Sequence, residues 1–243
     1  MSEPEPVRDD AVTDPRLTLL AERLRVVEER IQVACARAGR RREEITLVAV
    51  TKTVSTEVAA LLPTLNVTHL GESRPQELWR KAAALPPTIH WHLVGHLQRN
   101  KIERTLPLVH LIHSVDSLRL LTALEEEATK RQSPVDALLE VNASGEWSKR
   151  GFAPADVAGL AATIAGLKFV RIRGLMTMAA LEQDPERTRP TFATVRTIRD
   201  KLQHGLGSSI RLDRLSMGMT NDFEVAIEEG ATLVRIGTAL FER

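Results

Sequence analysis

Apolar and polar positions follow two different periods along the chain. Residues 15–38 carry apolar side chains three and four positions apart, which predicts a long amphipathic helix that ends near Gly39. Its predicted apolar stripe consists of Leu19, Leu20, Leu24, Val27, Ile31 and Ala34. After this helix, short β-rich runs alternate with segments of helical period. The predicted strands are Thr46–Val50, Val67–Leu70, Ile89–Val94, Leu108–Ile112, Val135–Val141, Val170–Leu175, Leu212–Leu215 and Thr232–Ile236. The predicted helices between them cover 55–63, 74–84, 98–105, 117–131, 155–166, 187–205 and 221–229.

This alternation predicts an α/β fold. The strands are nearly continuous apolar runs, as expected when both faces of a parallel sheet are buried. We therefore expect a single (β/α)8 TIM barrel with an extra N-terminal helix, and a doubly wound open sheet is the alternative. No shift of composition divides the chain. Residues 15–243 are expected to form one domain behind a disordered, acidic and proline-bearing lead-in of residues 1–14.

The composition of the chain argues against several classes of function. The net charge of +1 and the aromatic content of 3% give no electrostatic or stacking basis for binding nucleic acid. No apolar run approaches the roughly 18 residues of a membrane span. The single cysteine, Cys35, excludes an intramolecular disulfide and favours a reducing, cytoplasmic location. The sequence contains no tyrosine, so no phenol can serve as an acid or base.

A lysine, Lys52, follows the first predicted strand. In a barrel, function lies where strands lead into helices, so this lysine is expected in the barrel mouth. Desolvation there would favour the neutral amine, the nucleophile that forms a Schiff base with an aldehyde. The ordinary alternative is a lysine whose ammonium group simply reaches water.

Two glycine-bearing segments follow the last two predicted strands, "SMGMTND" (216–222) and "GTALF" (237–241). Asn221 and Glu224 fit a capping box, so the N–H groups of Gly218, Met219 and Thr220 are expected to face outward at a helix start and to form an anion site. Phosphate sites of barrels commonly use these two loops. The alternative for the first segment is a capped helix without a ligand.

An arginine, Arg235, lies inside the last apolar strand and must find an acceptor there. A structural ion pair with Glu72 or Glu140 is one explanation. A ligand is the other, because an amine for an aldehyde together with a phosphate cradle describes a site for pyridoxal 5′-phosphate (PLP), with Arg235 facing its ring.

The chain resembles the PLP homeostasis protein family (YggS/PROSC type), which is related to the N-terminal barrel of alanine racemase. The resemblance covers about residues 20–243, in the order of the family. The segments that carry it are "VAVTK" (48–52), "GESRPQE" (71–77), "HLVGHLQRNK" (92–101), "HSVDS" (113–117), "VNASGEWSKRGF" (141–152), "RGLMTM" (173–178), "SMGMTND" (216–222) and "RIGTALF" (235–241).

The resemblance implies a role for each matched residue. Lys52 matches the Schiff-base lysine, and Arg235 matches the arginine facing the pyridine nitrogen. Lys149 matches a second lysine, on a mobile loop. Ser73 stands where the family usually has an asparagine, which puts in doubt how this position orients the cofactor. The remaining matches to the phosphate loops and the pocket lining are Ser216, Gly218, Met219, Thr220, Gly237, Thr238, Met176 and His92.

The implied function is PLP binding in vitamin B6 homeostasis, with little or no catalysis. A charged arginine at the ring nitrogen disfavours its protonation, on which most PLP chemistry depends. One alternative is a weak PLP-dependent amino-acid racemase whose base is a pocket residue such as His92. A Schiff-base aldolase acting on a phosphorylated sugar is another. The expected partners are PLP and PLP-dependent apoenzymes that accept it, and the expected state is a monomer.

Overall fold

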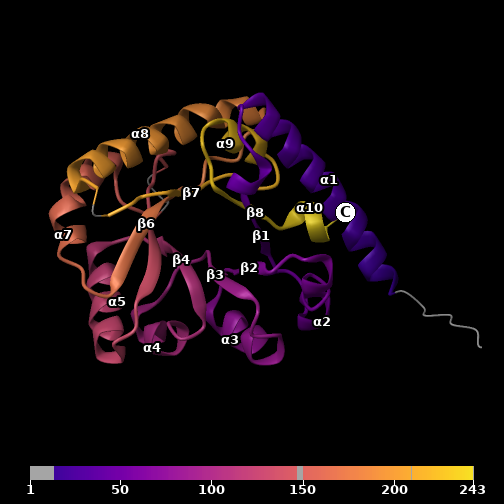
Figure 1. The fold of residues 1–243 in the computed structure, drawn as a ribbon, viewed down its shortest axis with the longest axis horizontal. Helices are drawn as coiled ribbons and strands as arrows, with labels where there is room; N and C mark the ends of the chain where they lie inside the picture. Colours follow the sequence, from indigo (N-terminus) through magenta and orange to yellow (C-terminus); the bar gives the residue numbers. More distant parts are fainter. Residues whose placement is uncertain (1–13, 147–149, 209, 243) are drawn as a thin grey trace, which may run out of the picture.

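Eight parallel strands close into a barrel in which each strand pairs with the next and β8 pairs with β1 (Figure 1). The computed structural model describes residues 14–146, 150–208 and 210–242. The expected (β/α)8 barrel is confirmed, and the open-sheet alternative is wrong. The strands are β1 Thr46–Val50, β2 His69–Glu72, β3 His90–Leu93, β4 Val109–Val115, β5 Val135–Glu140, β6 Val170–Met176, β7 Arg214–Ser216 and β8 Leu233–Ile236.

Helices surround the barrel (Figure 1). Several predicted helices are shorter or broken. The helix predicted at 55–63 ends at Ala59, before Pro63, and the one predicted at 98–105 begins only at Ile102, after a 3-10 turn at Arg99–Lys101. Gly159 lies between the two α-helical pieces of 154–165. None of the helices in the described ranges is long and apolar enough to cross a membrane. The helices are α1 Pro15–Arg37, α2 Thr56–Ala59, α3 Pro75–Ala84, α4 Ile102–Thr105, α5 Leu118–Arg131, α6 Pro154–Val157, α7 Ala161–Ala165, α8 Arg189–Leu206, α9 Phe223–Glu228 and α10 Thr238–Phe241.

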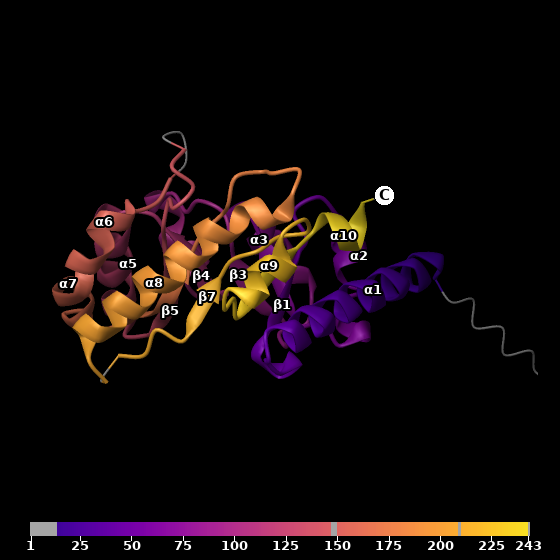
Figure 2. The same cartoon turned by 90° about the horizontal axis from the view of Figure 1, so that it is seen from above.

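The N-terminal helix α1 packs against α9 and α10 of its own barrel (Figures 1 and 2). Its apolar stripe is buried as predicted at four positions, but Leu19 is 44% exposed, so its assignment to the buried stripe is wrong. Arg30 of α1 donates to Glu224 at 2.6 Å and to the Thr220 carbonyl at 3.3 Å. Since Thr220 lies in the loop after β7, α1 braces that loop.

The barrel interior is polar as well as apolar. A small cluster separate from the main core consists of Val48, Leu111, Leu138, Met176 and Leu233, one residue from each of five strands. Strand alternation places this cluster inside the barrel. The same strands bury His113 and Arg235, with exposures of 0% and 5%. The inward face is therefore not the continuous apolar surface that the sequence pattern predicts.

A buried ion pair fixes the carboxyl ends of β1 and β2. Lys81 Nζ lies 2.6 Å from Glu72 Oε1 and 2.6 Å from the Thr51 carbonyl, and the Thr51 hydroxyl donates to the same carboxylate oxygen at 2.6 Å. Both charged side chains are only 1% exposed. Thr51 precedes Lys52 and Glu72 precedes Ser73, so the pair sets the strand ends from which two predicted site residues project.

We predict that Lys81→Met destabilises the protein by about 3–5 kcal/mol, because it leaves the Glu72 carboxylate buried without its cation. Urea unfolding followed by circular dichroism measures this. The double variant Lys81→Met/Glu72→Leu is the matched control, and we expect it to recover most of the lost stability. A single variant within 1 kcal/mol of the parent would contradict the prediction.

Candidate functional site

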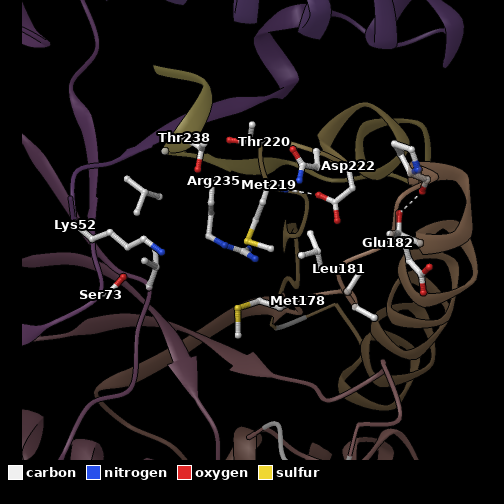
Figure 3. Close-up of a pocket in the computed structure, with 18 of the residues that line it drawn as sticks. Lys52, Ser73, Met178, Leu181, Glu182, Met219, Thr220, Asp222, Arg235 and Thr238 are labelled. Carbon is white, nitrogen blue, oxygen red and sulfur yellow. Dashed lines mark hydrogen bonds between the residues drawn. The ribbon is translucent and has the colours of Figure 1, made fainter. Parts of the chain in front are cut away.

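A cavity of about 290 Å³ opens at the carboxyl ends of the strands (Figure 3). This volume lies near the lower end of pockets for small ligands, about 300–1,000 Å³. The predicted site residues that line it are Lys52, Ser73, Met219, Thr220, Arg235, Gly237 and Thr238. Residues of four strand ends, β1, β2, β7 and β8, are thus brought to one pocket, as expected for a barrel site.

Lys52 and Arg235 extend toward the same space, and Thr220 and Thr238 lie together on another side of it (Figure 3). Lys52 is exposed to solvent, so the burial expected for it is wrong. Its amine can therefore be reached from outside without a movement of the barrel.

The loops after β7 and β8 are joined directly. The backbone N–H of Ala239 donates to Thr220 Oγ1 at 3.2 Å. In the described part of the chain, no hydrogen bond satisfies the backbone N–H groups of Thr220, Gly237 and Thr238. Gly218 has a φ of +91°, and a Cβ there would lie 2.6 Å from the Cβ of Ala226. Glycine at 218 thus allows the first loop to lie against α9.

The capping box expected at Asn221 and Glu224 is wrong. Helix α9 begins at Phe223, and its cap position is Asp222. Asp222 Oδ1 accepts a hydrogen bond from the Met219 backbone N–H at 2.6 Å, so that N–H is not free for an anion. Burial raises the pKa of the Asp222 carboxyl, and its hydrogen bond from Met219 opposes the rise.

Arg235 forms no ion pair with Glu72 or Glu140, the two partners considered from the sequence. Its Nη1 donates to Ser216 Oγ at 2.6 Å and its Nη2 to the Thr177 carbonyl at 2.9 Å. Burial lowers the pKa of Arg235 to about 10, with Asp222 and Glu140 opposing. The group is therefore charged at neutral pH, yet its hydrogen-bond acceptors among the described residues are neutral.

The other predicted site residues lie elsewhere. His92, Met176 and Ser216 are buried and do not line the cavity, and Gly218 does not line it either. Lys149 lies outside the described residues. For all the predicted residues, contact with a cofactor stays a prediction.

The loop after β6 contributes pocket residues that the sequence analysis did not single out, Met178 and Leu181 among them (Figure 3). Leu181 is 86% exposed, which is unusual for a leucine. Their only signal in the sequence is their position after a barrel strand.

Glu140 ends β5 and is 6% exposed. Burial, and next the nearby Asp116 charge, raise its pKa to about 7, and the charges of Arg235 and Arg150 oppose this. The sequence analysis considered Glu140 only as a partner for Arg235. The structure shows instead a carboxyl that changes its charge near neutral pH beside a buried cation.

Residues 23–242 match the family described as alanine racemase, N-terminal domain. A pyridoxal phosphate homeostasis protein of Aquifex aeolicus is 43% identical over 221 residues, which are 90% of this chain and 96% of that protein. The chain belongs to the pyridoxal phosphate homeostasis protein family. Another protein of that name, from Escherichia coli strain K12, is 35% identical over 230 residues, 91% of this chain and 95% of its own.

Solved structures agree with this assignment. The structure of PipY of Synechococcus elongatus with PLP bound has a TM-score of 0.78 at 33% identity, and the match covers 91% of this chain and 99% of that one. An alanine racemase of Corynebacterium glutamicum has a TM-score of 0.74 at 13% identity, covering 93% of this chain and 61% of that one. The second likeness shows a common barrel fold only.

Glu140 gives a pH-dependent prediction. Its pKa is raised in the folded protein from 4.5 to about 7, so the folded state binds more protons within this window and stability falls as the pH rises through it. Glu140→Gln keeps the shape without the charge. We expect it to be more stable than the parent above pH 7, by up to about 3 kcal/mol, and equally stable near pH 4. Urea unfolding at several pH values measures this, and a stability difference independent of pH would contradict it.

Proposed function

We propose that this chain is a PLP-binding protein that acts in PLP homeostasis, holding the cofactor on Lys52 with little or no catalysis of its own. The observation that carries the proposal is the arrangement of the pocket. Within the described residues, the backbone N–H groups of Thr220, Gly237 and Thr238 have no hydrogen-bond partner, and these residues line the pocket. The Lys52 side chain extends into the same pocket (Figure 3). The names of its relatives and the PLP-bound PipY structure support the choice of ligand.

The two loops fit a phosphate group. Backbone N–H groups gathered in a concave loop bind anions, and those of Thr220, Gly237 and Thr238 are unused within the described residues. The Thr220 hydroxyl accepts from Ala239, so its own hydrogen remains available to a ligand oxygen. Met219 is the exception, since Asp222 already accepts from its N–H. The remaining donors suffice for a phosphate.

Arg235 fits the ring of the cofactor. A guanidinium group has five N–H donors, and neighbouring residues accept from two of its nitrogens, leaving donors that can face the pocket. When bound, PLP supplies an aldehyde for Schiff-base formation and a ring that withdraws electrons from such adducts. The Arg235 charge opposes a second positive charge on the ring nitrogen. The pocket is therefore better suited to holding PLP than to using its electron-withdrawing ring.

The racemase alternative loses its candidate base. His92 is 1% exposed, and both of its ring nitrogens are engaged, with His69 at 2.9 Å and with His113 at 2.8 Å. It has no free nitrogen for a substrate proton. The relatives named above are pyridoxal phosphate homeostasis proteins, which favours a PLP site over the aldolase alternative.

Release of PLP to PLP-dependent apoenzymes belongs to the same proposal. The exposed Lys52 and the open pocket support exchange with a partner. A monomer fits the docking of α1 on its own barrel, which leaves no need for a second copy to cover that stripe. The buried free Cys35 accords with the expected reducing cytoplasm.

Lys52→Ala should abolish covalent attachment, although the phosphate loops should retain weak binding. Borohydride reduction of the PLP-loaded protein, followed by peptide mass mapping, tests this. Lys201→Ala, on the exposed face of α8, is the matched control and should trap PLP like the parent. A full yield of trapped adduct in Lys52→Ala would overturn the assignment.

Thr220→Ala removes the loop hydroxyl that bonds Ala239 and faces the pocket. We expect PLP affinity to fall about tenfold, which corresponds to about 1–2 kcal/mol for a hydrogen bond to a charged group. Titration of the visible absorbance with PLP measures the affinity. Thr194→Ala, whose hydroxyl bonds only its own helix, is the control. Unchanged affinity in Thr220→Ala would mean that the loop after β7 does not hold the phosphate.

A further inference from the structure

A chain of hydrogen bonds runs through the barrel interior and ends on Arg235. Arg235 Nη1 lies 2.6 Å from Ser216 Oγ, which lies 2.8 Å from His113 Nδ1. His113 Nε2 lies 2.8 Å from His92 Nδ1, and His92 Nε2 lies 2.9 Å from His69 Nδ1. Five strands supply these side chains, the consecutive strands β2, β3 and β4 on one side and β7 and β8 on the other.

Arg235 sets the direction of its own bond, because a guanidinium group only donates, and the single hydrogen of the Ser216 hydroxyl decides the direction of the others. Ser216 Oγ accepts from Arg235, and His113 Nδ1 is the acceptor that the described residues offer to the Ser216 hydrogen. His113 must then carry its hydrogen on Nε2 and donate to His92. By the same reasoning His92 carries its hydrogen on Nε2 and donates to His69. The chain therefore runs one way, from the pocket toward the amino-terminal ends of β2 and β3.

This direction requires each imidazole to be neutral with one hydrogen, and the surroundings enforce that. Burial holds the pKa of His92 and of His113 well below the ordinary value, and the Arg235 charge adds to the effect at His113. Burial and the charges of His90 and His110 lower the pKa of His69 to about 4. The outer end is accessible, since His69 is half-buried and stacks on the exposed His90 with ring centroids 4.7 Å apart.

The hydrogen-bond chain fixes the orientation of the Arg235 side chain. Its side chain is 5% exposed and has no carboxylate partner, so its orientation depends on two neutral acceptors, Ser216 Oγ and the Thr177 carbonyl. A serine hydroxyl can rotate, and only its donation to His113 keeps its lone pairs turned toward Arg235. With both acceptors fixed, the plane of the guanidinium group is fixed as well.

We propose that His113 is a positioning residue, and that with Ser216, His92 and His69 it forms a one-way hydrogen-bond relay that fixes the Arg235 guanidinium as a donor toward the pocket. The identity of the ligand that Arg235 meets rests on the proposed function. The relay itself belongs to the protein without a ligand.

Nitrogen NMR of the full chain, labelled at histidine and arginine and free of ligand, tests the relay directly. We expect His92 and His113 to be neutral with hydrogen on Nε2 from about pH 6 to pH 8, and Arg235 to give resolved, slowly rotating guanidinium signals. Hydrogen on Nδ1 of either histidine, or its titration in this range, would overturn the proposal.

Variants then test the effect on the pocket. Ser216→Ala breaks the relay next to Arg235, and His113→Leu removes the acceptor for Ser216. We expect both to lose the slow Arg235 signals and to bind PLP about tenfold more weakly, as for one lost hydrogen bond to a charged group. His113→Asn can return an acceptor to Ser216 and should restore the Arg235 signals. His204→Asn, on the exposed face of α8 and away from the relay, is the control and should match the parent.

The outcomes separate the two proposals. A parent protein with the expected tautomers that takes up no PLP would contradict the proposed function and leave the relay standing. Slow Arg235 signals and parental affinity in Ser216→Ala would overturn the relay, whatever the ligand. If His113→Leu fails to fold, Ser216→Ala and the spectra of the parent decide the matter.

Discussion

The rest of the site depends on one constraint, the buried positive charge of Arg235. Among the described residues, no carboxylate is bonded to this charge. Arg235 is 5% exposed, and its hydrogen bonds go to a serine hydroxyl and a backbone carbonyl. A buried charge is costly unless it is hydrogen-bonded, so the acceptors around it cannot be arbitrary. Ser216 and three histidines on neighbouring strands occupy barrel positions that an apolar residue would otherwise fill. Asp222 and Glu140 are not hydrogen-bonded to Arg235, but their charges favour its charged form and so oppose the lowering of its pKa by burial.

The two sides of the pocket are held by different kinds of contact. Lys52 and Ser73 project from strand ends that the buried Lys81–Glu72 pair ties together. The proposed phosphate side is a pair of loops joined by a hydrogen bond between Ala239 and Thr220. That side depends on α1, whose Arg30 reaches the Thr220 carbonyl. Membership of the pyridoxal phosphate homeostasis protein family rests on matches over about nine-tenths of the chain, such as residues 23–242. The shape of the pocket, in contrast, depends on a few contacts between distant segments.

The sequence predicts the barrel because apolar runs define its strands, and it fails where polar residues point inward. Strand β1 has the predicted limits, since all its residues are apolar or β-formers. Strand β4 runs on to Val115, three residues beyond the prediction, because His113 and Ser114 resemble the start of a loop in the sequence but are buried in the barrel. The two glycine-bearing loops that line the pocket could be predicted from glycines near strand ends. The histidine chain could not, since it depends on how distant strands are registered. The link between Asp222 and Met219 is local, and the sequence pattern misses it because it places the helix cap one residue earlier, at Asn221.

The histidine chain links the pocket to residues at the opposite end of the barrel, which a ligand in the pocket does not contact. Its outer end, His69, lies beside the exposed His90 at the amino-terminal ends of the strands, whereas the ligand pocket opens at their carboxyl ends. Substitutions at the outer end can therefore alter how strongly Arg235 donates without changing the shape of the pocket. In the evolution or engineering of such barrels, substitutions at the amino-terminal ends of the strands can thus change how strongly a pocket residue donates. Every residue in contact with the ligand is retained.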